Sequence, residues 1–420
     1  MIKDLPELVE AGIISEATAA QIRHYYFQKN PQPQNRLLIA FGILGALLIG
    51  LGIILIIAHN WDELARWFKT VLAFVPLVVG QVACAYTLLK KQESIAWREA
   101  SSAFLFMSVG ASISLISQIY NLGGNLSSFL LVWMLLCAPL IYVMRSSIAS
   151  LCYLIGITYY VSETGYWSRY DGGNPHLYWM LLLIPLPHYY HLYKQNIASN
   201  FLTFHHRFVS LSILIALGTA AKSSEEFMAI AYMSLFGLFY LIGSLFIDEE
   251  NNEYKKLGAL GTVAMFIGFS FKWFWEELSK QDLRLLSPEF IIAALLSVLA
   301  LLLFFYKQKR KPKKSFNPLE LAFVWFILIF VAGIGSYILA TVLINIFALA
   351  IGVYTVVRGS KQNHLGILNY GLLIITTLVV CRFFDTDMTF VVRGVLFVLV
   401  GIGFFVANYS MLQKRRHHEQ

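Results

Sequence analysis

The most constraining feature of this chain is a series of uncharged, strongly apolar blocks, each close to twenty residues long. A helix of that length crosses the apolar core of a bilayer, which is about 30 Å thick. Hydrophobic residues make up 58% of the 420 residues and charged residues only 13%, whereas soluble domains carry about 25% charged residues. The sequence therefore predicts an all-α fold, a polytopic integral membrane helical bundle.

The blocks predict about 14 transmembrane helices, although counts of twelve or thirteen also fit the pattern. Two prolines, Pro185 and Pro187, interrupt one block, and the region 127–162 also fits a single long hairpin. The expected spans are 37–58, 70–89, 100–120, 127–144, 147–162, 177–193, 208–221, 227–247, 257–275, 289–306, 317–334, 337–357, 364–382 and 388–409.

The positive charges test this pattern, because lysine and arginine collect in cytoplasmic loops. With both termini inside, the expected inner segments hold 23 of the 32 lysine and arginine residues. The net charge of +8 therefore reflects membrane topology, and we expect no nucleic-acid partner. The first 36 residues are polar and the block 37–58 is too long for a signal-peptide core, so we expect no cleaved signal peptide.

The polar ends of the chain predict two small cytoplasmic parts around a transmembrane domain at 36–410. Residues 1–35 read as a helical hairpin and linker, in which Gly12 ends one helix and Ser15 caps the next. Residues 411–420 form a basic tail. The hairpin rests on the membrane or on inner loops, or it docks a partner protein; membrane lipids are the other expected partners.

The cysteines and histidines show no metal-binding pattern. Cys84, Cys137, Cys152 and Cys381 lie in or beside apolar blocks without ligand spacing, so they are expected to be small core residues. The histidines of "PLPHYYHLY" (185–193) have no acidic residue nearby in the sequence, and we interpret them as interfacial. We expect no metal, no cofactor and no catalytic residue.

The stretch "IIAHNWDELARWFK" (56–69) places two carboxylates after the first apolar block. Asn60 is a favourable N-cap, and Asp62 and Glu63 would suit the dipole of a helix's first turn. Trp61 suits the aromatic belt at a membrane interface. Helix initiation is the favoured interpretation, and a role in substrate binding is the alternative.

The third expected span ends in "GASISLISQIYNLGGN" (110–125), where small and polar residues recur at helical spacing. Ala111, Ser114, Gln118 and Asn121 form one stripe, which in lipid must face protein or water. Hydrogen bonding between helices and the lining of an outward cavity are equally compatible with this stripe.

Near the C-terminus, "CRFFDTDMTFVVRG" (381–394) places charges around an outer turn. Arg393 lies about 7 to 8 Å into the last expected span, so it snorkels to the interface or serves a function. We expect it to pair with Asp385, Asp387 or Asp62 in an outward polar pocket. The residues assigned to that pocket are Asn60, Trp61, Asp62, Glu63, Gln118, Tyr120, Asn121, Arg382, Asp385, Asp387 and Arg393.

Three stretches together, "LVEAGIISEATAAQIRHYY", "IAHNWDELARWFK" and "SQIYNLGGN", resemble a bacterial family of predicted membrane proteins known as domain of unknown function 2157. Residues 365–401 resemble the family's C-terminal pattern. This chain has Ala65 where the family has Pro, and Asn125 where it has Asp. The resemblance implies a multi-pass protein of the bacterial cytoplasmic membrane and no defined activity.

These observations favour a non-enzymatic, transporter-like protein, whose substrate would be a lipid-linked or cell-envelope precursor. The alternatives are a glycosyltransferase-like membrane enzyme with outward carboxylates and a structural or assembly partner in a membrane complex. The short first outer loop disfavours the enzyme, because polytopic glycosyltransferases have a long one.

Overall fold

The computed structural model is all-helical in every regular element that it describes, as the sequence predicts. The chain forms two compact units, Met1–Leu72 and Ala73–Gln420. The described residues are 5, 9, 11–29, 61–167, 173–195, 199–221, 224–246, 252–280, 284–310, 317–383, 389–391, 394, 395, 397, 398, 401–403 and 405.

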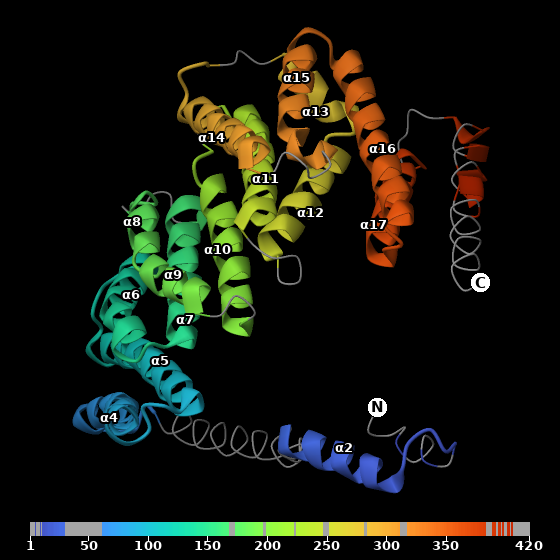
Figure 1. Cartoon of the computed structure of the whole chain (residues 1–420). Coiled ribbons are helices and arrows are strands. Elements are labelled where there is room, and N and C mark those ends of the chain that lie inside the picture. Colours follow the sequence, from blue (N-terminus) through green and yellow to red (C-terminus); the bar gives the residue numbers. More distant parts are fainter. Residues whose placement is uncertain are drawn as a thin grey trace. The chain divides into compact units, whose positions relative to one another are not determined.

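The helices follow the apolar blocks (Figure 1). Their bounds are α2 Glu16–Lys29, α4 Arg66–Lys90, α5 Ile95–Tyr120, α6 Leu126–Val143, α7 Ser147–Ser162, η2 Glu163–Trp167, α8 Leu177–Leu183, α9 Leu186–Gln195, α10 Asn200–Gly218, α11 Glu226–Phe246, α12 Glu253–Gly268, α13 Lys272–Leu278, α14 Pro288–Arg310, η3 Pro318–Glu320, α15 Ala322–Gly335, α16 Tyr337–Lys361 and α17 Leu365–Phe383.

Local signals account for several helix ends. The side chain of Ser146 accepts a hydrogen bond of 3.1 Å from the Ala149 amide at the start of α7. The Asn252 side chain accepts one of 3.0 Å from the Lys255 amide at the start of α12. Pro185 separates α8 from α9, because proline has no amide hydrogen to continue a helix.

In the first unit, the predicted cap at Ser15 is confirmed. Gly12 has a φ of 68°, and the Ser15 hydroxyl accepts a hydrogen bond of 3.2 Å from the Thr18 amide as α2 begins. The earlier helix of the expected hairpin falls mostly outside the described residues, so the hairpin itself stays a prediction.

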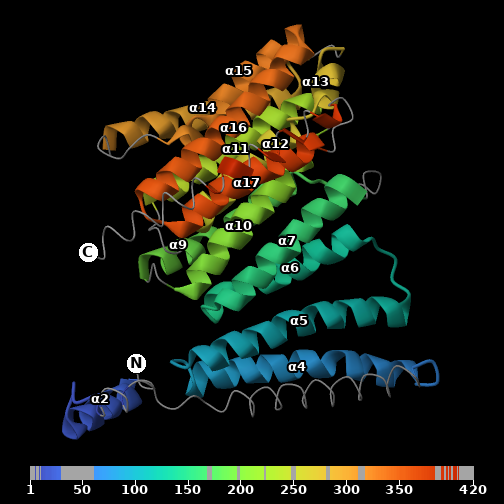
Figure 2. The same ribbon diagram turned by 90° about the vertical axis from the view of Figure 1, so that its right-hand side faces the viewer.

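Within the second unit, one group of helices surrounds a core that includes Phe106, Met134 and Tyr153. Helices α5, α6 and α7 contact one another, and α10 packs against α7. From Ala73 onward, α4 runs beside α5 (Figure 2). Helix α10 also contacts α11 and α12, so it joins this group to the rest of the unit.

The other group is built around α11, which contacts α12, α14 and α15, and around α16, which contacts α15 and α17. Its core includes the fully buried side chains of Trp275, Phe323 and Phe326. Helices α11 and α12 approach closely at Gly258, where an added Cβ would lie 2.5 Å from the backbone nitrogen of Tyr240.

The expected span 257–275 is not a single straight helix, because the chain bends by 78° between α12 and α13. No proline lies at this bend, and the local sequence feature there is Gly268, the last residue of α12. The freed backbone carbonyl groups accept hydrogen bonds from side chains instead. The Trp275 indole donates a hydrogen bond of 2.7 Å to the carbonyl oxygen of Phe269. The side-chain amide of Asn345 donates one of 2.8 Å to the carbonyl oxygen of Ser270.

The expected count of 14 spans is not confirmed. Eight helices among the described residues are long and apolar enough to cross a membrane, or nine if α12 and α13 form one broken span. Three expected spans fall short of a full crossing, because α7 has 16 residues, α15 has 14, and 177–193 is split into α8 and α9. The expected span 37–58 and part of 388–409 lie outside the described residues.

Candidate functional site

A groove of about 1240 Å³ lies among α4, α5 and α6. Its lining includes Phe74 and Leu77 from α4, Gln118 from α5, and Phe129 and Val132 from α6. Drug-sized ligands occupy pockets of about 300 to 1,000 Å³, so the groove has room for a larger molecule.

The polar rim of the groove is formed by the connection between α5 and α6. Asn121 ends α5 in the left-handed conformation, with a φ of 50°, and Gly123 and Gly124 follow it in the rim. The Asn125 side chain then caps α6 by accepting hydrogen bonds of 2.9 Å from the Ser128 amide and the Ser127 hydroxyl. Asparagine and aspartate cap helices about equally well, so Asn125 fills this position without a charge.

The walls of the groove are fixed by contacts between the helices. The Ser112 hydroxyl of α5 donates a hydrogen bond of 2.7 Å to the carbonyl oxygen of Ala73 in α4. The Trp133 indole of α6 donates one of 2.8 Å to Phe106 O in α5. Gly110 lies directly against the Trp133 ring, where an added Cβ would come within 2.5 Å.

The polar stripe predicted on α5 partly lines this groove. Ser114, Gln118 and Asn121 face it, whereas the exposed residues Ala111 and Tyr120 are not part of its lining. Ser114 and Gln118 are exposed in the groove, while Ser112, which is not part of the stripe, bonds another helix.

The interpretation of Asp62 and Glu63 as first-turn residues is wrong. Helix α4 begins only at Arg66 and has no acidic residue in its first turn. Both carboxylates are exposed in a preceding turn, where the Leu64 amide bonds Trp61 O at 3.3 Å. The Lys69 ammonium group lies 5.4 Å from the centre of the Trp61 ring. Asn60, the expected cap, lies outside the described residues.

At the other end of the chain, Arg382 lies beside the bend between α12 and α13. Its Nη2 donates a hydrogen bond of 3.2 Å to the Ser270 hydroxyl, and its guanidinium lies 4.6 Å from the Phe271 ring centre. Asp385, Asp387 and Arg393 fall outside the described residues, so the predicted ion pairs of Arg393 are not tested.

A second polar cluster, which the sequence analysis missed, surrounds Glu99. This carboxylate is 6% exposed and accepts hydrogen bonds from the Ser146 hydroxyl and from the amides of Ser147 and Ile148 at the N-terminus of α7. Such a position suits a carboxylate, because the helix dipole and free amides there favour negative charge. The sequence signal that could have indicated this cluster was the acidic residue Glu99 directly before the expected span 100–120.

The histidine interpretation changes accordingly. His188 is buried, and its Nε2 lies 3.4 Å from the hydroxyl of Ser147, which also bonds Glu99 through its amide. The neighbouring His205 is fully buried, with Nε2 3.0 Å from the Ser150 hydroxyl. Ser147 therefore links His188 to an acidic residue that is distant in sequence, and His191 is exposed.

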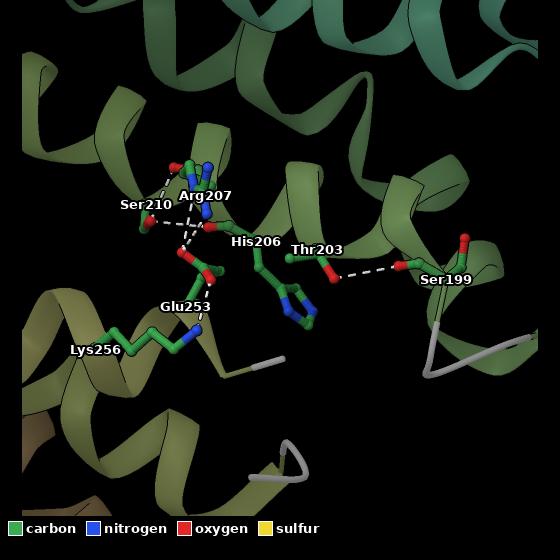
Figure 3. Close-up of polar contacts among 7 residues, drawn as sticks. All are labelled: Ser199, Thr203, His206, Arg207, Ser210, Glu253 and Lys256. Atoms are coloured by element: carbon green, nitrogen blue, oxygen red, sulfur yellow. Dashed lines mark hydrogen bonds and ion pairs between the residues drawn. The ribbon is translucent and has the colours of Figure 1, made fainter. Parts of the chain in front are cut away.

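An ion-pair network involves Arg207, two residues beyond His205 on α10 (Figure 3). The Glu253 carboxylate of α12 lies 3.0 Å from Arg207 Nη2 and 3.0 Å from Lys256 Nζ. The side chain of Arg207 is 50% exposed, so solvent screens this pair and we assign it a modest role in holding α10 against α12.

Within the part of the chain that the structure describes, no group of three or more histidine, cysteine, aspartate or glutamate side chains is placed to hold a metal ion. All four cysteines are free.

Long apolar helices with many exposed apolar side chains define the class of the protein, a multi-pass helical membrane protein. Residues 6–150 match the family model described as predicted membrane protein (DUF2157), which confirms the resemblance for that part of the chain. The match includes the whole lining of the groove. No curated protein and no solved structure matches the chain.

Proposed function

We propose that this membrane protein is transporter-like and that the groove among α4, α5 and α6 holds the substrate, an amphiphilic lipid-linked or cell-envelope precursor. The observation that carries the proposal is the distribution of polar and apolar groups along the groove. Gln118, Asn121 and Asn125 lie at or near the connection between α5 and α6, whereas Val132 and Leu136 lie farther along α6. The distance from Asn125 to Leu136 along the helix is about 16 Å.

The chemistry of the lining supports a particular kind of headgroup. None of the described residues lining the groove is charged, and its polar groups are amides and hydroxyls. Such groups hydrogen-bond sugar hydroxyls and amide substituents, whereas a bound phosphate would favour arginine or lysine. The apolar part of the substrate would remove the exposed side chains of Phe74, Val132 and Leu136 from contact with solvent or lipid.

The proposal includes the orientation predicted from charge, with the protein in the cytoplasmic membrane and both termini inside. In that orientation the polar rim near Asn121 opens outward. We also propose that residues 1–35 form a cytoplasmic hairpin and that the total number of spans is close to 14, since the described helices overlap most of the expected ranges.

Photo-crosslinking in intact cells tests the groove directly. With p-benzoylphenylalanine in place of Val132, we expect covalent lipid adducts enriched in sugar-bearing lipids, identified by mass spectrometry. Leu302, an exposed apolar residue of α14 outside the groove, gives the matched background of ordinary phospholipids. Gln118→Leu should remove the enrichment at position 132, and the exposed control Gln362→Leu should not.

Two results would overturn this proposal. Equal phospholipid adducts at positions 132 and 302 would show that the groove has no preference for sugar-bearing lipids. A crosslink from position 132 to a peptide of residues 37–58 would show that the groove holds the chain's own segment.

Transport is tested separately in proteoliposomes. A fluorescent glycolipid should become accessible to dithionite faster in vesicles with the wild-type chain than with Gln118→Leu. Equal rates for the two proteins and for empty vesicles would leave a lipid-binding protein that does not transport.

A further inference from the structure

A buried charged cluster lies far from the groove in sequence, where the last turn of α14 meets η3 and α11. The Lys307 ammonium group forms an ion pair with the Glu320 carboxylate, and their side chains are only 7% and 5% exposed. A buried charge without its partner is costly. In this pair the two charges are both buried and neutralise each other.

Tyr240 of α11 lies beside both Asn317, which precedes η3, and a further cation. The Asn317 side chain donates a hydrogen bond of 2.6 Å to the Tyr240 hydroxyl, and it caps η3 by accepting one of 3.1 Å from the Leu319 amide. The same hydroxyl lies beside the guanidinium of Arg358, in the last turn of α16.

Arg358 gives the cluster an excess positive charge. No carboxylate within the described residues forms an ion pair with it, while Lys307 and Glu320 cancel. The Nε of Arg358 is buried and has no hydrogen-bond partner there. The negative end of the helix dipole explains a cation in this turn, but it does not explain a buried N–H group without an acceptor.

We propose that Arg358 binds a phosphate group, carried by an anionic lipid headgroup or free in solution. A planar guanidinium pairs with phosphate through two parallel hydrogen bonds, so one such contact satisfies Nε and the charge together. Three exposed cations, Lys309, Arg310 and Lys361, lie in the same helix ends. Basic sites at the ends of membrane helices attract anionic headgroups in this way.

The experiment uses the full chain purified in a neutral detergent. Binding of phosphatidylglycerol and phosphatidylcholine is measured by native mass spectrometry, with thermal stabilisation as a second readout. Wild type should prefer phosphatidylglycerol, and Arg358→Gln should lower that affinity by about tenfold, the scale of one charge-assisted pair. Lys280→Gln, which removes an exposed cation outside this cluster, should keep the preference.

Arg358→Lys retains the charge but not the planar donor pair, so it should fall between wild type and Arg358→Gln, and it replaces the glutamine variant if that protein does not fold. A further measurement tests thermal stabilisation by inorganic phosphate. Stabilisation by millimolar phosphate equal to that by phosphatidylglycerol assigns the site to free phosphate, and stabilisation by the lipid alone assigns it to the headgroup. Unchanged lipid preference in both Arg358 variants, or an equal loss of preference in Lys280→Gln, would overturn the proposal.

Discussion

The Ser146 hydroxyl donates a hydrogen bond of 2.5 Å to the carboxylate of Glu99, a residue 47 positions earlier in the chain. Together with the amides of Ser147 and Ile148, this contact ties the start of α5 to the start of α7. If this buried carboxylate is removed, the three groups that donate hydrogen bonds to it lose their acceptor.

We therefore predict that Glu99→Ala lowers the free energy of unfolding by about 3 kcal/mol. The measurement is the thermal denaturation midpoint of the purified protein in detergent. Glu93, an exposed acidic residue just before α5, provides the control, and Glu93→Ala should leave the midpoint unchanged. Equal midpoints for the two variants would show that the Glu99 contacts contribute little.

The contact between α11 and α12 gives a second prediction. An alanine at Gly258 would place its Cβ 2.5 Å from Tyr240 N and 2.7 Å from Phe236 O, so the helices must separate. We expect Gly258→Ala to destabilise the protein by about 1 to 3 kcal/mol. At Gly268, on the same helix, no atom lies within 4 Å of an added Cβ, and Gly268→Ala should be neutral. Chemical denaturation of both variants would compare them, and equal stability would contradict the close packing.

The orientation proposed from charge predicts the location of three loops. Reporter fusions at positions 92 and 312 should lie in the cytoplasm, and a fusion at position 172 should lie outside. Activities of a cytoplasmic and a periplasmic reporter distinguish these locations. If positions 172 and 312 report the same side, the arrangement of spans between them is wrong.

The pairing proposed for Arg393 predicts the behaviour of a charge exchange. A charge in the membrane costs about 2.5 to 3.5 kcal/mol at its centre and less near the surface, so a carboxylate partner favours insertion. We expect Arg393→Asp to reduce the amount of inserted protein and the added change Asp385→Arg to restore part of it. Arg284→Asp, at an exposed position, is the control. Normal insertion of Arg393→Asp alone would exclude the pair.

The sequence by itself determined most of the helices and the class of the protein. A helix forms its backbone hydrogen bonds between residues four positions apart, and a membrane-spanning helix is a continuous apolar block in the sequence. The break at Pro185 and the cap at Ser15 were predictable for the same reason, since each depends on its immediate neighbours.

The contacts between distant segments were decided only by the tertiary structure. Glu99 meets the N-terminus of α7, and the bend after Gly268 relies on Asn345, 75 residues beyond the Ser270 carbonyl that it bonds. The groove likewise depends on how α4, α5 and α6 pack, so the sequence predicted the polar stripe around Gln118 but not the walls facing it. Periodicity specifies which face of a helix is polar, whereas the partner of that face depends on packing between helices, which no local pattern encodes.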